Sequence, residues 1–145
     1  MHESAEPIPV QYLHLAPEDP LPEVPNPLPS RVVVIVEAEV SAQWQAATSD
    51  WLVGSGCLYM MAWGLGCSSW DDAVDWALLD AFRFEDVPPE RFVRTTWHEN
   101  ETLDDAFFFC KQCAFHESVP LMKTVLLHIS KQPAEQRIMD AYAQA

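Results

Sequence analysis

Three polar side chains that follow apolar runs could carry acid–base chemistry. Glu37 closes the run VVVIV, and His98 and Glu99 close the segment RFVRTTW. A carboxylate at the end of a buried strand is partly desolvated, which raises its pKa toward the range that general acids and bases need. A nearby histidine would supply the complementary group. We therefore predict Glu37, His98 and Glu99 as candidate catalytic residues; the simpler explanation is that strand ends of any α/β protein are polar.

The stretch WGLGCSSWDD, residues 63–72, contains a candidate nucleophile. Cys67 lies just before a predicted helix N-terminus, where a thiolate is stabilised, and His98 could act as its base. The acidic neighbours Asp71 and Asp72 oppose this role, because they raise the pKa of the thiol. The side chains expected to line a ligand site beside these groups are Glu39, Trp63, Asp71 and Trp97.

The same stretch also has a structural explanation. Gly64 and Gly66 permit a tight turn. Ser69 and Asp72 have the spacing of a capping box, and Trp70 begins an apolar stripe. A turn from a strand into a helix therefore accounts for most of the stretch, and only its position at a strand end points to a site.

Several known site patterns are absent from the sequence. Neither GxGxxG nor GxxxxGK[ST] follows the first apolar run, and no GxSxG pattern is present. Cys110 and Cys113 have CxxC spacing, but they lie inside a helical pattern, and no second CxxC could complete a zinc site. We therefore expect no cofactor and no metal, and four reduced cysteines that pack as small apolar side chains.

The elements that must position these residues alternate between strand and helix patterns. Apolar and β-branched runs predict four strands, and segments with 3.6-residue periodicity between and after them predict four helices. The predicted strands are residues 31–40, 57–64, 91–99 and 123–130, and the predicted helices are residues 41–56, 68–82, 101–116 and 133–144. This alternation predicts an α/β fold of three layers, with a four-stranded parallel sheet between helices.

Strand order is predicted from the apolar content of each run. The first two runs are continuously apolar and are expected at the centre, whereas FVRTTWH alternates polar and apolar residues and is expected at an edge. This favours the order 3-2-1-4. The flavodoxin-like order 2-1-3-4 is the alternative.

The first thirty residues differ from the rest in composition. They contain eight of the twelve prolines and five acidic side chains, with no lysine, arginine or glycine. We predict an extended arm of polyproline type over residues 1–30 and a single α/β domain over residues 31–145.

Charge limits the classes of partner. The chain has 22 acidic and 8 basic residues, for a net charge of -14, so nucleic acid and anionic membrane are poor partners, whereas a basic protein surface is a good one. Trp76 and Leu79 fall on the polar side of the second predicted helix and could anchor an interface. Without a signal peptide or an apolar run long enough to span a bilayer, the chain is expected to be cytoplasmic.

Three segments together resemble a known family. SGCLYMMAWG, CSSWDDAVDWA and TTWHE are similar to segments of small bacterial proteins grouped as a domain of unknown function, over about residues 31–130. The resemblance implies bacterial origin, and it implies no activity and no catalytic residue.

Two hypotheses about function follow from the sequence. The preferred one is a non-catalytic acidic module that binds a protein partner or its own copy, and it requires an exposed Trp76. The alternative is a small enzyme or small-molecule binder with a site over Glu37, Cys67, His98 and Glu99. It requires at least two of these groups to lie within hydrogen-bond distance.

Overall fold

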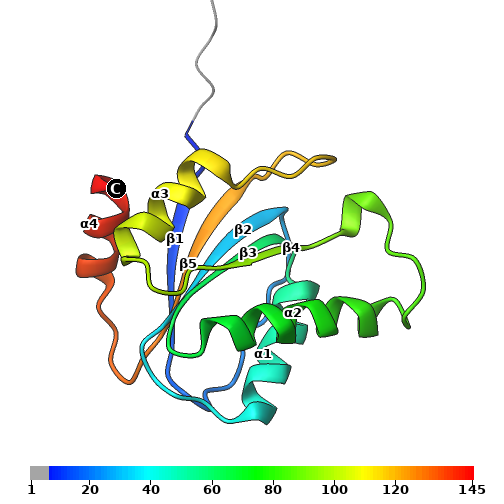
Figure 1. Ribbon diagram of the computed structural model, residues 1–145, viewed down its shortest axis with the longest axis horizontal. Coiled ribbons are helices and arrows are strands. Elements are labelled where there is room, and N and C mark those ends of the chain that lie inside the picture. Colours follow the sequence, from blue (N-terminus) through cyan, green and yellow to red (C-terminus); the bar gives the residue numbers. More distant parts are fainter. Residues whose placement is uncertain (1–6) are drawn as a thin grey trace, which may run out of the picture.

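The computed structural model describes residues 7–145, and strands alternate with helices from the second strand onward (Figure 1). The first six residues of the predicted arm lie outside the described residues. The strands are β1 (Val10–Leu15), β2 (Ser30–Val36), β3 (Cys57–Gly64), β4 (Arg94–Trp97) and β5 (Lys123–Ile129). The helices are α1 (Ala42–Gly54), α2 (Cys67–Ala81), α3 (Leu103–Cys113) and α4 (Glu135–Gln144), with a single 3-10 turn at Pro89–Arg91.

The fold class is α/β with a parallel sheet, but the predicted four-stranded sheet is wrong. The sheet has five strands in the order β1-β5-β2-β3-β4, and every neighbouring pair is parallel. The four predicted strands follow one another in the expected order 3-2-1-4, as β4-β3-β2-β5, but the order of the whole sheet differs because a fifth strand lies beyond β5. The additional strand is β1, which pairs with β5 at the edge opposite β4.

The prediction of an extended polyproline arm is wrong for residues 10–15. The segment VQYLHL forms β1, although prolines at positions 7, 9, 17 and 20 surround it. Prolines cannot donate hydrogen bonds within a sheet, but they are tolerated beside an edge strand. The proline content around the segment concealed a strand whose own residues contain no proline.

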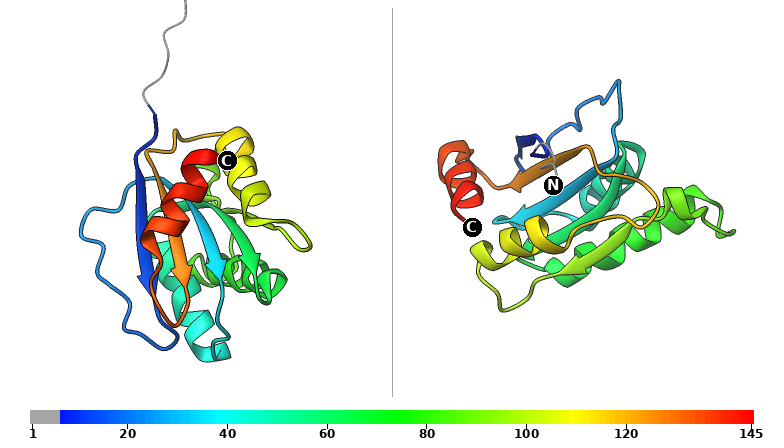
Figure 2. Two further views of the ribbon diagram at one scale, coloured as in Figure 1. Left: turned by 90° about the vertical axis from the view of Figure 1, so that its left-hand side faces the viewer. Right: turned by 90° about the horizontal axis from the view of Figure 1, so that it is seen from above.

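Helices cover both faces of the sheet. α1 and α2 lie on one face, and α3 and α4 lie on the other (Figure 1, and from two further sides in Figure 2). Alternate residues of β2 point to opposite faces, so that Val32 and Val34 pack under α1 and α2 while Val33 and Ile35 pack under α3 and α4. A strand buried on both sides has the continuous apolar pattern seen in the sequence.

The predicted capping box at Ser69 is wrong. A cap at Ser69 requires the helix to begin at Trp70, but α2 begins at Cys67, after Gly66 in a left-handed conformation. The Ser69 hydroxyl donates instead to the Gly66 carbonyl at 2.6 Å. A capping box is present instead at α3, where Thr102 and Asp105 satisfy each other's backbone N–H groups. Among residues 7–145, no helix is both long and apolar enough to cross a bilayer.

Candidate functional site

The sheet has a topological switch point between β2 and β5. These two strands are neighbours, yet the chain leaves β2 toward α1 on one face and leaves β5 toward α4 on the other. Ligands of open α/β sheets bind beyond the carboxyl ends of strands at such a point. The side chains that end β2 and β5 are therefore the first candidates for a site.

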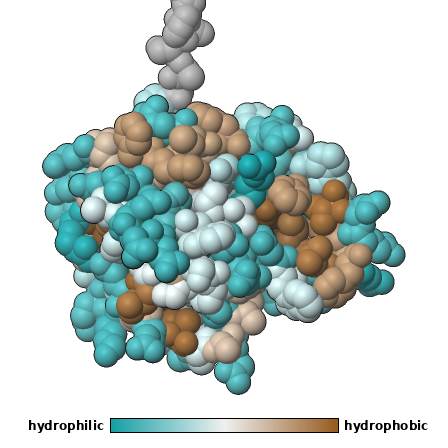
Figure 3. All heavy atoms as spheres, viewed as in Figure 1, coloured by the Kyte–Doolittle hydropathy of each residue, from teal (hydrophilic) through white to brown (hydrophobic). Residues whose placement is uncertain are grey.

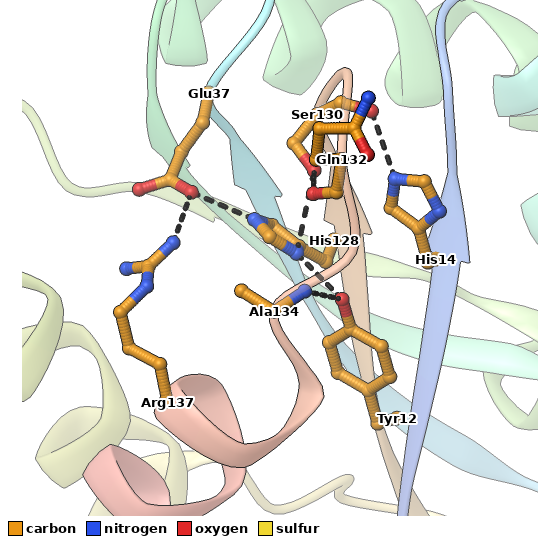
Figure 4. Close-up of polar contacts among 8 residues, drawn as sticks. All are labelled: Tyr12, His14, Glu37, His128, Ser130, Gln132, Ala134 and Arg137. Atoms are coloured by element: carbon orange, nitrogen blue, oxygen red, sulfur yellow. Dashed lines mark hydrogen bonds and ion pairs between the residues drawn. The ribbon is translucent and has the colours of Figure 1, made fainter.

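Glu37 and His128 meet at this switch point (Figure 4). The Nε2 of His128 lies 2.7 Å from the Glu37 carboxylate, and Arg137 of α4 donates to the same oxygen at 2.7 Å. Because a carboxylate can only accept, the ring N–H of His128 donates to it. His128 is completely buried, whereas 29% of the Glu37 side chain is exposed. The carboxylate thus connects a buried imidazole to the surface.

The other nitrogen of His128 is bonded to Tyr12 of β1. The Tyr12 hydroxyl lies 2.7 Å from Nδ1 and accepts from the Ala134 backbone N–H at 2.9 Å, so that its own proton can be donated to the ring. Both ring nitrogens are then satisfied with one proton on the ring. Ser130 lies farther away, at 3.5 Å from Nδ1, and its hydroxyl donates to the Gln132 carbonyl. Tyr12, His128, Glu37 and Arg137 form one chain of hydrogen bonds, which we call the switch-point cluster (Figure 4).

Opposing effects act on the Glu37 carboxyl group. Burial alone raises its pKa, but hydrogen bonds and charges from Arg137 and His128 outweigh burial and hold the pKa below its ordinary value. This is the opposite of the raised pKa expected from the sequence. The partners that decide the direction come from β5 and α4, so they could not be seen from residues 31–40.

Glu37→Gln is expected to destabilise the protein at neutral pH and to lose this effect in acid. A carboxyl group whose pKa is lowered by folding stabilises the fold above its unfolded pKa, and this contribution disappears as the pH falls through the folded pKa. Urea unfolding of wild type and variant should therefore differ above pH 4.5, the ordinary value, and converge below it. Glu39→Gln is the control, because Glu39 follows the same strand but forms no ion pair within residues 7–145. A difference that stays constant with pH would contradict this account of Glu37.

The structure does not bring Glu37 and His98 together. β3 lies between the strands that these two residues follow. His98 is buried, its Nδ1–H donates to Glu101 at 3.1 Å, and the Thr96 hydroxyl donates to its Nε2 at 2.9 Å. Its ring also packs edge-on against Phe109, with centroids 4.8 Å apart. His98 is therefore held in a separate cluster at the β4 edge.

The other predicted catalytic residues are also separated. Cys67 is buried in the core under α1 and α2, which is the face opposite Glu37 and His128. Glu99 is exposed in the turn after β4. Glu39 lines a hollow of about 300 Å³ between the end of β2 and the start of α2.

The remaining predicted ligand-binding residues lie apart from one another. Trp63 is partly buried, and its indole N–H donates to the Glu101 carbonyl at 2.8 Å. Asp71 is only 7% exposed, and its Oδ1 has no hydrogen-bond partner among the described residues. Trp97 is 49% exposed at the edge of the sheet. Of the six tryptophans, only Trp44 and Trp70 are buried in the core.

A second candidate site lies between α1 and α2. A groove of about 580 Å³ runs between these helices, and Trp76 in its wall is 65% exposed. The Trp76 ring also contacts the exposed Phe84, with centroids 5.3 Å apart. The charged residues that line the groove are three aspartates, and no lysine or arginine lines it. We therefore call it the acidic groove. The lining residues are Gln45, Ala46, Asp50, Ser69, Asp72, Ala73, Trp76, Ala77 and Asp80.

Hydrophobic atoms also gather near the acidic groove. Leu79, predicted with Trp76 as an interface residue, is 40% exposed on α2. Figure 3 shows hydrophobic side chains where the chain leaves α2 and turns back toward β4, with hydrophilic atoms around them. Both predicted interface residues are therefore accessible.

The residues of the switch-point region that were not predicted from the sequence are Tyr12, His14, His128 and Arg137. Tyr12 and His14 belong to the unpredicted strand β1, and His14 contacts the Ser130 carbonyl through Nε2 at 2.8 Å. Arg137 lies in α4, far from Glu37 in the sequence. One available signal was the expected pairing of residues 123–130 with residues 31–40, which placed His128, rather than His98, beside Glu37.

Comparison with known proteins assigns the chain to a family. A family model described as a domain of unknown function (DUF7684) matches residues 10–145. The resemblance inferred from the three segments is confirmed, and the match includes β1 and α4 as well. No curated protein and no solved structure matches the chain.

Proposed function

We propose that this chain, which belongs to the DUF7684 family of domains of unknown function, is a non-catalytic module that binds a basic segment of a protein partner. The binding surface in this proposal is the acidic groove. The observation that carries the proposal is an exposed tryptophan in the wall of a groove whose charged lining residues are all carboxylates.

The chemistry of the acidic groove fits lysine and arginine side chains. Trp76 presents an aromatic ring that can accept a cation over its face, and tryptophan is the strongest side chain for this interaction. Asp50 lies on α1 and Asp72 and Asp80 lie on α2, so the carboxylates flank the ring from two helices. Tryptophan is also enriched among residues that dominate interface energies. The groove thus combines an apolar anchor with charges that select basic partners.

The charge of the whole chain supports the same class of partner. A net charge of -14 attracts a basic surface at long range and speeds association at low salt. It also disfavours nucleic acid, whose phosphates would be repelled.

Trp76→Ala is expected to weaken binding of a lysine- and arginine-rich peptide by at least about tenfold, the loss typical of a central aromatic anchor. Affinity should be measured by biolayer interferometry with the full chain on the surface. Trp97→Ala is the matched control, because Trp97 is an exposed tryptophan outside the groove. Equal losses in the two variants would contradict the assignment of the acidic groove.

The charges can be tested separately from the ring. Replacing Asp50, Asp72 and Asp80 together by asparagine should slow association and flatten its salt dependence. The control removes three exposed charges elsewhere, through Glu90→Gln, Asp104→Asn and Glu135→Gln. If both triple variants bind the peptide alike, only the net charge of the protein affects binding, and the carboxylates of the acidic groove have no specific role.

A second candidate function is small-molecule binding or acid–base chemistry at the switch-point cluster. We propose it because Glu37 and His128 lie where ligands of open α/β sheets bind and the Tyr12 hydroxyl is connected to both. A proton could move between the hydroxyl and the carboxylate through the imidazole. This version differs from the sequence hypothesis, which paired Glu37 with His98.

A thermal-shift screen against common metabolites tests the second candidate. A ligand that binds only the folded protein raises the melting temperature. A hit at the switch-point cluster should disappear in Glu37→Gln and in Tyr12→Phe and persist in Glu39→Gln. A hit that persists in all three variants would contradict a site at this cluster.

A further inference from the structure

The connection from β1 to β2 leaves a hollow beneath it. Residues 16–29 replace the helix that usually joins parallel strands, and prolines occupy positions 20, 22, 25, 27 and 29. We call residues 20–29 the proline strap. Figure 2 shows it standing away from the edge of the sheet. Because proline fixes the backbone and cannot donate a hydrogen bond, the strap forms neither a helix nor a strand, although its Leu21 packs against the core.

The strap encloses a cavity of about 340 Å³, which we call the strap cavity. Its floor is formed by Leu13, Val32 and Val125 on three neighbouring strands, and its roof is formed by residues 22–26. Trp51 of α1 forms a wall, and its indole N–H donates to a strap carbonyl at 2.7 Å. This volume is at the lower end of the range for small-molecule pockets, and its apolar floor is typical of them.

A lysine that forms no side-chain hydrogen bond or ion pair within residues 7–145 lines the strap cavity. Lys123 is the first residue of β5 and is only partly exposed. Within residues 7–145, its ammonium group has no carboxylate within ion-pair distance and no hydrogen bond. Such a lysine, partly buried and unpaired within the described part of an acidic chain, is unexpected. Gln11 and Ser30 add polar atoms to the same lining.

We propose that the strap cavity binds a small amphipathic carboxylate, whose apolar body lies on Leu13, Val32 and Val125 and whose carboxylate pairs with Lys123. The apolar floor supplies affinity through burial of the ligand's hydrocarbon surface. The ammonium group supplies orientation and selectivity for an anionic head. This site is independent of the acidic groove and of the switch-point cluster, since it lies at the amino ends of the strands.

Two features of the molecule disfavour an anionic ligand, but the contact with Lys123 outweighs both at short range. Glu23 also lines the strap cavity, but it is exposed and borders the outer surface of the strap as well, so its carboxylate can turn to solvent. The negative charge of the whole chain is screened beyond roughly 8 Å at physiological salt. The contact with Lys123 lies well inside that distance in the proposed complex.

Isothermal titration of the full chain with octanoate, octanol and octylamine at physiological salt tests the proposal. Octanoate should bind with one-to-one stoichiometry and at least about tenfold more tightly than octylamine. Lys123→Gln should remove the preference for octanoate over octanol and leave octanol binding unchanged. Lys131→Gln is the matched control, because it removes an exposed lysine that follows the other end of β5 and should change nothing.

A second variant keeps the test decisive if the charge effect is small. Val125→Phe fills the floor of the strap cavity and should abolish binding of both octanoate and octanol, and thermal unfolding should be used to verify that the variant folds. Leu13→Phe replaces it if Val125→Phe does not fold, because Leu13 is only partly buried. The proposal is overturned if octanoate fails to bind at millimolar concentration, if octylamine binds more tightly, or if the filled variant binds like wild type.

Discussion

Gly64→Ala is expected to lower the free energy of unfolding by about 3 kcal/mol, at the upper end of the cost of a strained residue. Gly64 ends β3 with φ of +104°, a conformation that residues with a side chain rarely adopt. A Cβ atom there would lie 2.1 Å from the backbone oxygen of Val36 on the neighbouring strand. Backbone cannot move aside as a flexible side chain can, so the end of β2 must separate from β3.

Gly66→Ala is the matched control for this prediction. Gly66 also has a positive φ, of +60°, but a Cβ atom there meets only the Ser69 hydroxyl at 3.4 Å. We expect a cost of about 1 kcal/mol, which is the strain of the left-handed conformation alone. Urea unfolding of both variants measures the difference. Equal costs would show that close approach of the strands at Gly64 adds nothing to the strain.

Arg31→Ala is expected to lower the free energy of unfolding by about 3 kcal/mol through a different mechanism. Arg31 is only 5% exposed, and no carboxylate lies within ion-pair distance of it in the described part of the chain. Its guanidinium donates to the Thr124 hydroxyl and to the Cys110 carbonyl, both at 2.7 Å. A longer bond, at 3.4 Å, reaches the Ala114 carbonyl at the end of α3.

The buried cation is stabilised by the end of a helix rather than by an acid. Carbonyls at a helix C-terminus carry partial negative charge, and Arg31 donates to two of them, those of Cys110 and Ala114. Its removal leaves these oxygens and the Thr124 hydroxyl in a cavity between β2, β5 and α3.

Two further substitutions separate packing from hydrogen bonding at this position. Arg31→Met restores volume but no donors, and it should recover only part of the loss. Arg94→Ala is the surface control, because Arg94 forms an exposed ion pair with Glu117 and such pairs contribute at most about 1 kcal/mol. If Arg31→Met were as stable as wild type, the hydrogen bonds of Arg31 would contribute nothing.

How much of the fold could be predicted depended on where each element is buried. β2 and β3 are covered on both faces, so their continuous apolar runs identified them as inner strands. β4, expected at an edge, lies at an edge. β1 is also an edge strand, but its alternating pattern lies among prolines. The proline content led to the prediction of an extended arm instead of a strand.

Helix faces were predictable where apolar residues are periodic and not where polar residues are buried. On α2, the apolar stripe that begins at Trp70 is buried and Trp76 on the polar side is exposed, as predicted. On α1, the apolar Ala47 is exposed, while the polar Thr48 and Ser49 are buried. Both hydroxyls donate to backbone carbonyls one turn earlier, which removes the cost of burying them.

The sequence by itself determined the α/β class, the family and the exposed tryptophan on an acidic helix, because these depend on local periodicity and composition. Only the tertiary structure decided which polar residues meet. Glu37 pairs with His128 and Arg137 rather than with His98, and Tyr12 joins them from a strand that the sequence concealed. Strand order and side-chain direction place these groups together from segments about a hundred residues apart, and no local pattern records such pairings.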